Sequence, residues 1–386
     1  MKRTIYLDNA ATTKLSKTAI DAMLPFLIEG YGNPSTVYFL GQQAKNAVEG
    51  ARTTIAKAIG ALPEEVFFTS GGTESINWAI KSAAEMKKDK RRHIITSTIE
   101  HPAVLNTLKH LEKKGYELTY LGVDEYGQIS LDELSGAIRS DTALITIMSA
   151  NNEIGTILPT QEISRAAKAK DSNVLFHTDA VQAVGHIPIN IKEMGADLLS
   201  FSGHKFGGAK GVGVLYVKKG LKLPPYHHGG GQELGMRSGT ENVAGIVSTA
   251  AALEEAVSLL PLARVATMRD RLIEEVLKIP RSHLTGDPVN RLPGIASFVF
   301  QGVEGESMLL LLDQCGICAS SGSACSSGSL EPSHVLLALG LTHETAHGSL
   351  RFSLGEDNTD DDIDYALEKL PGVIAKLRAM SPLWHE

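Results

Sequence analysis

The chain has 386 residues, of which 43% are hydrophobic, 21% charged and 5% aromatic, with a formal net charge of −7. This composition is typical of a soluble globular protein and excludes a disordered or fibrous chain, and the negative charge argues against a nucleic-acid partner. No apolar run approaches the ~18 to 20 residues of a membrane span, and Asp8 interrupts the N-terminus before a signal-peptide core develops. We therefore expect a cytoplasmic protein that does not insert into membranes.

Helical patterns alternate with short apolar runs in the first part of the chain. The apolar runs are EVFFTS (65–70), HIITST (93–98) and TALITIMSA (142–150), and helices are predicted at about 42–60, after GGTES and from His101. The helix at about 42–60 has apolar residues three or four positions apart, which are Ala44, Val48, Ala51, Ile55 and Ile59. This alternation predicts an α/β fold with a mainly parallel sheet flanked by helices.

The pattern changes after about residue 260. A charged helix at MRDRLIEEVLKI (268–279) is followed by proline-containing loops and by a final acidic helix after DNTDDD (357–362). Since a domain usually has ~100 to 200 residues, we predict two domains. The large one comprises residues 16–259, and a smaller α+β domain comprises residues 1–15 and 260–386 and carries a cysteine loop at about 318–332.

The segment FFTSGGTES (67–75) combines a strand-like run, two glycines and hydroxyl groups before a helix predicted near Ile76. Backbone amides at a helix N-terminus bind phosphate, so Gly72 and Thr73 are candidate phosphate ligands. The segment lacks both the Gly-Lys-Ser/Thr ending of a nucleotide P-loop and the third glycine of a dinucleotide fingerprint. A purely structural Gly-Gly turn is the alternative.

Lys205 and Asp179 follow two short apolar runs, ADLLSFSG (196–203) and VLFHTDA (174–180), which predict neighbouring strand ends. Ligands collect at the carboxyl ends of strands in open α/β sheets. A lysine amine forms a Schiff base with the aldehyde of pyridoxal 5′-phosphate, and a carboxylate keeps its pyridine nitrogen protonated. The pair predicts a pyridoxal-phosphate enzyme, with a surface lysine and a strand-capping aspartate as the alternative.

The three cysteines all lie between residues 315 and 325, which is too clustered for a disulfide framework. Cys315 and Cys318 form a C-x-x-C pair, but no fourth ligand has a fitting spacing, so we predict no metal site. Their setting, LLLLDQCGICAS (309–320), is apolar and strand-like and predicts buried small side chains. Cys325 lies instead in SSGSACSSGS (320–329), whose composition predicts a flexible arm.

Short motifs occur in order along nearly the whole chain. They are YLDNAATT (6–13), GNPS (32–35), FTSGGTES (68–75), EHPAV (100–104), NNEIGT (151–156), HTDAVQ (177–182), SGHK (202–205), RSGT (237–240), SSGSACSSGS (320–329) and SLRFSLG (349–355). As an ordered set they closely resemble the cysteine desulfurases of the class V aminotransferase superfamily, in the branch that serves iron–sulfur cluster assembly. The resemblance implies the type I fold of pyridoxal-phosphate-dependent transferases, with a large domain and a smaller C-terminal one.

The resemblance also implies a role for each residue around the cofactor ring. Lys205 would form the Schiff base, Asp179 would face the pyridinium nitrogen, and His101 would stack on the ring and transfer protons. Asn152 and Gln182 would approach the hydroxyl side of the ring. Without the resemblance, His101 could simply cap the helix that Pro102 opens, and Asn152 could simply shape a turn.

The cofactor phosphate would be held by the helix start at Gly72 and Thr73, together with Ser202 and His204. Thr240 would reach it from a second subunit, so the resemblance implies a homodimer. Thr240 and Arg237 belong to a second glycine cluster, HHGGGQELGMRSGT (227–240), for which a plain surface loop is the alternative.

Arg351 and Cys325 complete the implied site. Arg351 would bind the carboxylate of L-cysteine as a fork, and Cys325 would take the substrate sulfur as a persulfide while L-alanine is released. The persulfide would pass to an acceptor protein such as an iron–sulfur scaffold, with a transient cluster at Cys325 as one form of that transfer. An ordinary surface arginine is the alternative for Arg351.

The chain departs from the family pattern at Tyr38, Leu234 and Gly294, where a histidine, an arginine and an asparagine are usual. Leu234 removes a charge from the loop that carries Thr240. Housekeeping members continue beyond the position of SPLW (381–384) into a tail that docks the scaffold, and we expect this chain to lack that tail. The alternatives to a cysteine desulfurase are a selenocysteine lyase or an aminotransferase of the same fold, and an inactive scaffold or thiol sensor. Cys325 separates them, because an aminotransferase does not need it.

Overall fold

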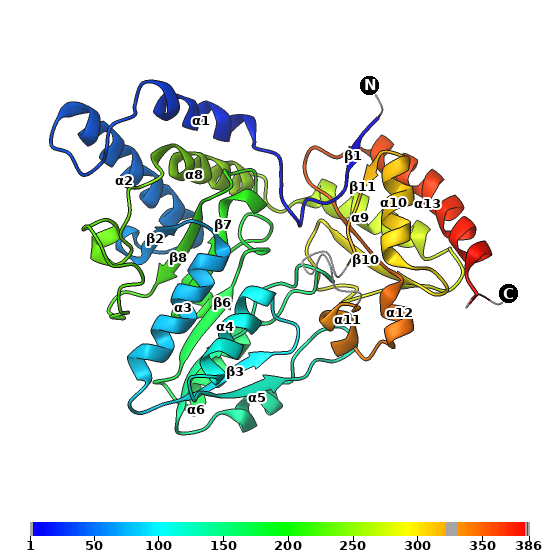
Figure 1. Cartoon of the computed structure of the whole chain (residues 1–386), viewed down its shortest axis with the longest axis horizontal. Helices are drawn as coiled ribbons and strands as arrows, with labels where there is room; N and C mark the ends of the chain where they lie inside the picture. Colours follow the sequence, from blue (N-terminus) through cyan, green and yellow to red (C-terminus); the bar gives the residue numbers. More distant parts are fainter. Residues whose placement is uncertain (1–2, 322–330, 383, 385–386) are drawn as a thin grey trace.

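The computed structural model describes residues 3–321, 331–382 and 384 (Figure 1). In these ranges the strands form sheets of seven, three and two strands, and helices cover the larger sheets. The predicted α/β fold, with a mainly parallel sheet flanked by helices, is confirmed. The division into residues 16–259 and the remainder stays a prediction.

The seven-stranded sheet has the order β2-β8-β7-β6-β5-β3-β4. Its strands are β2 (Val66–Thr69), β3 (His93–Ser97), β4 (Glu117–Leu121), β5 (Thr142–Thr146), β6 (Leu175–Asp179), β7 (Leu198–Ser202) and β8 (Gly213–Val217). Strands β4, β3, β5, β6 and β7 pair in parallel, whereas β8 is antiparallel to both β7 and β2. The sheet is therefore mainly parallel, as predicted, and β2 joins it through the antiparallel strand β8.

Two helical layers bury the faces of this sheet. The helices are α1 (Lys17–Ile28), α2 (Phe39–Ile59), α3 (Gly72–Lys87), α4 (Pro102–Glu112), α5 (Leu131–Ala137), α6 (Thr160–Lys170), α7 (Ile191–Met194) and α8 (Val243–Ser258). Helices α3 and α4 pack on one face with Ile94 of β3, while α2, α6 and α8 pack on the other with Ile95. Strands buried on both faces are typical of parallel sheets. The predicted stripe of α2 is buried as expected.

The C-terminal part forms a second core around a three-stranded antiparallel sheet. This sheet has β10 (Ile295–Phe300) between β9 (Ser282–Leu284) and β12 (Ser349–Ser353). The N-terminal strand β1 (Ile5–Tyr6) joins it in space by pairing with β11 (Ile317–Cys318). The accompanying helices are α9 (Ala263–Val276), α10 (Gly305–Gln314), α11 (His334–Ala338), α12 (His343–His347) and α13 (Asp360–Met380).

The leucine run before the C-x-x-C pair is a helix. Residues 309–312 belong to α10, Cys315 ends that helix, and Cys318 lies in β11. The strand-like interpretation of LLLLDQ is thus wrong, since a short apolar run does not distinguish a strand from a buried helix. Both thiols are half-buried and free of disulfides.

Among the described residues, no single helix is both long and apolar enough to cross a membrane. Helices α8 and α9 are bent by 73° relative to each other. Only when the two are counted together do their length and composition suffice for a membrane span.

Candidate active site

A cavity of about 270 Å³ lies at the carboxyl edge of the seven-stranded sheet. Most of the residues predicted for the site line it, and these are Gly72, Thr73, His101, Asn152, Asp179, Gln182, Ser202, His204, Lys205 and Arg351. The structure therefore brings together predicted residues from six of the quoted motifs. Cys325 lies outside the described residues.

The sheet order explains why these residues meet. Asp179 ends β6, whereas His101, Asn152 and Lys205 follow β3, β5 and β7. The carboxyl ends of these parallel strands share one edge of the sheet. Strand β2 is antiparallel to β8, and β8 is antiparallel to β7. The two reversals restore the direction of β7, so the start of α3 at Gly72 reaches the same edge.

Lys205 ends a short 3₁₀ turn, Gly203–Lys205, which follows β7 directly. Its Nζ donates to the carbonyl oxygens of Ala10 at 2.6 Å and Ala11 at 2.9 Å. The Ala10 oxygen also accepts from Nε2 of Gln182 at 2.9 Å, and the Thr13 amide donates to the carbonyl of His204. The N-terminal segment is thus fixed across the Lys205 loop. The motif YLDNAATT was part of the resemblance, but sequence reasoning gave it no function.

Asp179 is the last residue of β6 and is 5% exposed. Its Oδ1 accepts the backbone N–H of Val181 at 2.9 Å. Burial raises the pKa of this carboxyl to about 6, and the positive charge of Lys205 acts in the opposite direction. A protonated ring nitrogen beside Asp179 would supply the further positive charge that a buried carboxylate needs.

His101 is the N-cap of α4, and its Nδ1 accepts the N–H of Ala103 at 3.1 Å. The proton of the neutral ring therefore lies on Nε2. Burial lowers the pKa of His101 to about 4, and the charges of Lys205 and His334 lower it further. The plain alternative of a helix cap is correct, yet the same ring also lines the cavity. His101 is therefore a fixed, uncharged imidazole at neutral pH.

Glu100 was missed by sequence reasoning and is fully buried behind this site. Its Oε1 accepts from Oγ of Ser97 at 2.7 Å and from the N–H of Met148 at 2.9 Å. Burial raises the pKa of Glu100 to about 8, and the charge of Asp179 raises it too. Glu100 is thus neutral at neutral pH and adds no negative charge next to Asp179. A lone glutamate gives no sequence signal for burial.

Helix α3 begins at Gly72, four residues before the predicted start near Ile76. A second cavity of about 400 Å³ adjoins its first turn and shares Gly72, Thr73, Ser202 and His204 with the first. Helix N-termini bind phosphate through their unpaired amides. A Cβ on Gly72 would lie 2.8 Å from Cγ2 of Val181, so the position is tightly packed. The residues present therefore suit a phosphate group at this helix start.

Replacing Gly72 with alanine is expected to weaken, roughly tenfold, the binding of the pyridoxal phosphate that the sequence motifs imply. The added methyl group displaces Val181 and shifts the first amides of α3, and such overpacking costs ~1 to 3 kcal/mol. Titration of the apoprotein with the cofactor measures this loss. Gly50→Ala is the matched control, because a Cβ there meets nothing within 4 Å. Equal affinities of the two variants would contradict the expectation.

Arg351 lies in the middle of β12 and is 4% exposed. Its Nη1 donates to the carbonyl of Asn152 at 2.7 Å, and its Nη2 donates to Oδ1 of Asp8 at 2.8 Å. The Nε atom is buried and has no hydrogen-bond partner among the described residues. The backbone of Ser320, five residues before Cys325, pairs with that of Arg351 in both directions, at 2.7 and 3.1 Å. The cysteine segment therefore begins next to the arginine.

Residues 5–366 match the family model of class-V aminotransferases. The chain belongs to the class-V aminotransferase family. A protein of Methanosarcina thermophila named cysteine desulfurase IscS is 54% identical to this family member over 383 residues, which are 99% of this chain and 94% of the relative. The family resemblance expected from the motifs is confirmed.

Two solved structures are similar to this class-V aminotransferase. A NifS-like protein has a TM-score of 0.91 and 40% identity, and the match covers 97% of this chain and all of that one. A structure of SspA in complex with cysteine has a TM-score of 0.81 and 37% identity, with 91% and 99% coverage. The predicted fold type is confirmed by these matches.

The loop with the second glycine cluster behaves differently from the rest of this class-V site. Thr240 is exposed, and it is not among the described residues that line either cavity. Arg237 forms a fork on Glu74 in the first turn of α3, with distances of 2.7 and 3.1 Å. Leu234 is 77% exposed and has a positive φ of 57°. The contribution of Thr240 from a second subunit stays a prediction.

Proposed function

We propose that this chain is a cysteine desulfurase that uses pyridoxal 5′-phosphate to convert L-cysteine into L-alanine and a persulfide on Cys325. The observation that carries the proposal is the single cavity in which Lys205, buried Asp179 and Arg351 meet. The relative from Methanosarcina thermophila, named cysteine desulfurase IscS, supports it through 54% identity over almost the whole chain.

The described residues suit the cofactor, and each has a separable task. Lys205 would hold its aldehyde carbon, Asp179 its ring nitrogen, and the first turn of α3 its phosphate. The bound cofactor supplies an electron sink for the substrate carbon. Lys205 Nζ would take the Cα proton of the substrate as a general base. Neutral His101 lies in the same cavity and can hold a proton at Nε2.

Arg351 and Cys325 would act on opposite ends of the substrate. The guanidinium fork binds the carboxylate of L-cysteine. The Cys325 thiolate attacks the substrate sulfur, an S–S bond forms, and the Cβ–Sγ bond breaks with its electron pair left on the carbon skeleton. Cys325 follows Ser320, whose backbone pairs with that of Arg351, by five residues, which span at most ~18 Å. A segment of this length that starts beside Arg351 is long enough for the Cys325 thiol to reach the cavity.

The decisive experiment follows sulfur and alanine from the same reaction. The holoprotein is incubated with L-cysteine, alanine is quantified, and peptide mass spectrometry locates one added sulfur. We expect one persulfide on Cys325 per first alanine, and loss of sulfide release in Cys325→Ser. Cys315→Ser and Cys318→Ser are matched controls that remove the other thiols. Full alanine formation by Cys325→Ser would instead favour a lyase that needs no carrier thiol.

We also propose a homodimer, because apolar side chains are exposed along α1 and the start of α2. The exposed residues are Leu24, Leu27, Ile28, Tyr31, Val37, Tyr38 and Phe39. These two helices lie at one edge of the molecule (Figure 1). Large exposed apolar patches mark protein–protein interfaces, and a two-fold dimer buries the same patch on both subunits.

Leu27→Asp combined with Phe39→Asp is expected to give a monomer with little desulfurase activity. Two charges in an apolar interface oppose association, and Thr240 of the partner would no longer reach the phosphate. Sedimentation measures the mass, and alanine release measures the activity. Leu310→Asp is the matched control, because Leu310 is similarly exposed on α10, away from this patch. A double variant that stays dimeric would refute the proposed interface.

Three features follow from the proposed activity. We propose that Cys325 passes its sulfur to an acceptor protein, with an iron–sulfur scaffold as the first candidate and a transient cluster at Cys325 as part of the transfer. We propose the cytoplasm as the location. Transfer of labelled sulfur from the persulfide form to a purified scaffold protein tests the acceptor.

A further inference from the structure

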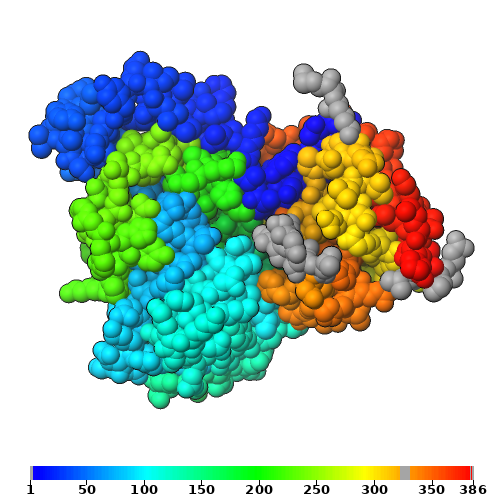
Figure 2. All heavy atoms as spheres, in the orientation of Figure 1, coloured from blue at the N-terminus to red at the C-terminus, as the bar shows by residue number. Residues whose placement is uncertain are grey.

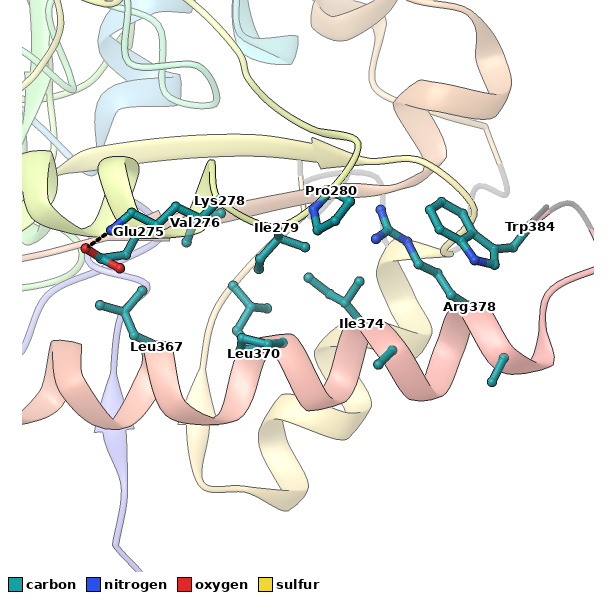
Figure 3. A pocket seen from close by; sticks show the side chains of 13 residues that line it. Glu275, Val276, Lys278, Ile279, Pro280, Leu367, Leu370, Ile374, Arg378 and Trp384 are labelled. Atoms are coloured by element: carbon teal, nitrogen blue, oxygen red, sulfur yellow. Dashed lines mark hydrogen bonds and ion pairs between the residues drawn. The ribbon is translucent and has the colours of Figure 1, made fainter. Parts of the chain in front are cut away.

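A separate cavity of about 580 Å³ lies between the end of α9 and the last half of α13 (Figure 3). Its walls are mostly apolar and include Val276, Ile279, Pro280, Leu370 and Ile374. None of the described residues that line the active-site cavity takes part in it. Binding sites for small molecules usually have ~300 to 1,000 Å³ and apolar walls with a few placed polar groups.

A buried cation stands at one end of this cavity. Arg378 is 7% exposed, and its guanidinium stacks on the ring of Trp384 at 3.9 Å (Figure 3). Its Nε donates to the carbonyl of Gln301 at 3.0 Å, but its Nη2 is buried without a hydrogen-bond partner in the described part of the chain. Leaving a donor of a buried charged group unpaired is unfavourable.

A second guanidinium increases the positive charge at the same end. The guanidinium carbon of Arg281 lies 5.0 Å from the centroid of the same Trp384 ring. Neither Arg281 nor Arg378 forms an ion pair with a carboxylate among the described residues. Burial lowers the pKa of Arg378, and the charge of Arg281 lowers it further. Among the residues that the structure describes, no carboxylate therefore offsets the positive charge at this end.

The opposite end of the cavity is electrically neutral. Lys278 and Glu275 form an ion pair with each other at 2.5 Å, as the dashed line in Figure 3 shows. Between the two ends, α13 runs from Leu367 to Arg378, a distance of about 16 Å at 1.5 Å per residue. The cavity thus combines a long apolar wall with a cation at one end only.

We propose that this cavity binds an amphipathic organic anion, namely a carboxylic acid with a linear aliphatic chain. The carboxylate accepts hydrogen bonds from the Arg378 guanidinium, and the chain lies along Ile374, Leu370 and Leu367. Burial of the chain supplies most of the affinity, and the charged hydrogen bonds select an acid over a neutral molecule of the same length. The site is independent of the proposed desulfurase activity.

Calorimetric titration of the full-length holoprotein with decanoate tests the proposal, with decanol as the uncharged probe of equal length and acetate as the probe without a chain. We expect decanoate to bind and both other probes to bind at least tenfold more weakly. Arg378→Met is expected to weaken decanoate binding roughly tenfold to a hundredfold while leaving decanol unchanged. A negative heat-capacity change is expected for burial of the chain.

Two further variants make the test independent of the stability of Arg378→Met. Lys376→Met removes the same charge from an exposed position of α13 and should bind decanoate like the parent chain. Ala375→Phe fills the cavity from an exposed position and should abolish binding while the protein stays folded. Absence of decanoate binding, equal binding of decanol, or an equal effect of Lys376→Met and Arg378→Met would each overturn the proposal. An acidic apolar peptide that binds where decanoate does not would also overturn it.

Discussion

Lys205→Ala is expected to lower kcat/KM for L-cysteine by about 10²- to 10⁴-fold, which is the usual range for loss of a general acid or base. Lys205 Nζ donates to the carbonyl oxygens of Ala10 and Ala11, and Lys205 lines the same cavity as Asp179. No other described lysine lines this cavity, so none can replace it there. Alanine release measured at several cysteine concentrations gives the rate constant.

Borohydride reduction of the parent protein with bound cofactor, followed by peptide mapping, provides an independent check. We expect the reduced cofactor on the peptide that contains Lys205 and on no peptide of Lys205→Ala. Lys222→Ala is the control, because Lys222 is an exposed lysine outside both active-site cavities. Cofactor attached to a different lysine of the parent protein, or unchanged turnover by Lys205→Ala, would disprove the role of this residue.

The location of Lys205 and Asp179 at one sheet edge was predictable from the sequence. Each follows a short apolar run that breaks into a polar, glycine-containing loop, and parallel neighbours in a sheet end at the same edge. The structure confirms that β6 and β7 are adjacent and parallel, with Asp179 opposite Ser200. Local pattern was sufficient here because Asp179 is the last residue of β6 and Lys205 comes three residues after the end of β7.

The path of β2 and β8 was not predictable in the same way. The sequence alternation predicts a mainly parallel sheet without indicating which strand departs from it, and β8 returns antiparallel after the short connection from β7. A short connection without a crossover helix permits only an antiparallel neighbour. The helix start at Gly72 reaches the site because the chain direction reverses twice, from β7 to β8 and from β8 to β2. Which strands pair in this way is determined by tertiary structure.

Contacts between distant segments were the least predictable part of the site. Asp8 pairs with Arg351, and the carbonyls of Ala10 and Ala11 accept from Lys205. These partners are separated by about two hundred residues or more in sequence, so neither periodicity nor spacing indicates them. The motif that contains Asp8 contributed to the family resemblance without suggesting this ion pair.

Arg351→Met is expected to lower kcat/KM for L-cysteine roughly tenfold to a hundredfold, mainly through a higher KM. Hydrogen bonds to a charged group contribute ~1.5 to 3 kcal/mol, and methionine keeps the buried volume without the fork that binds a carboxylate. The substrate must share the guanidinium with Asp8 and the carbonyl of Asn152. Steady-state alanine release, compared between L-cysteine and cysteine methyl ester, measures the effect of the carboxylate.

Asp8→Asn separates substrate binding from protein stability. Both variants break the ion pair between Asp8 and Arg351, whose side chains are 19% and 5% exposed, so both should unfold at lower denaturant concentration than the parent. Asp8→Asn nevertheless retains the guanidinium and removes its competing carboxylate, and its KM for L-cysteine should therefore stay the same or fall. If Asp8→Asn raised KM as much as Arg351→Met, the ion pair would serve the fold, and the substrate carboxylate would bind elsewhere. Opposite changes in KM with similar losses of stability would assign the fork of Arg351 to the substrate.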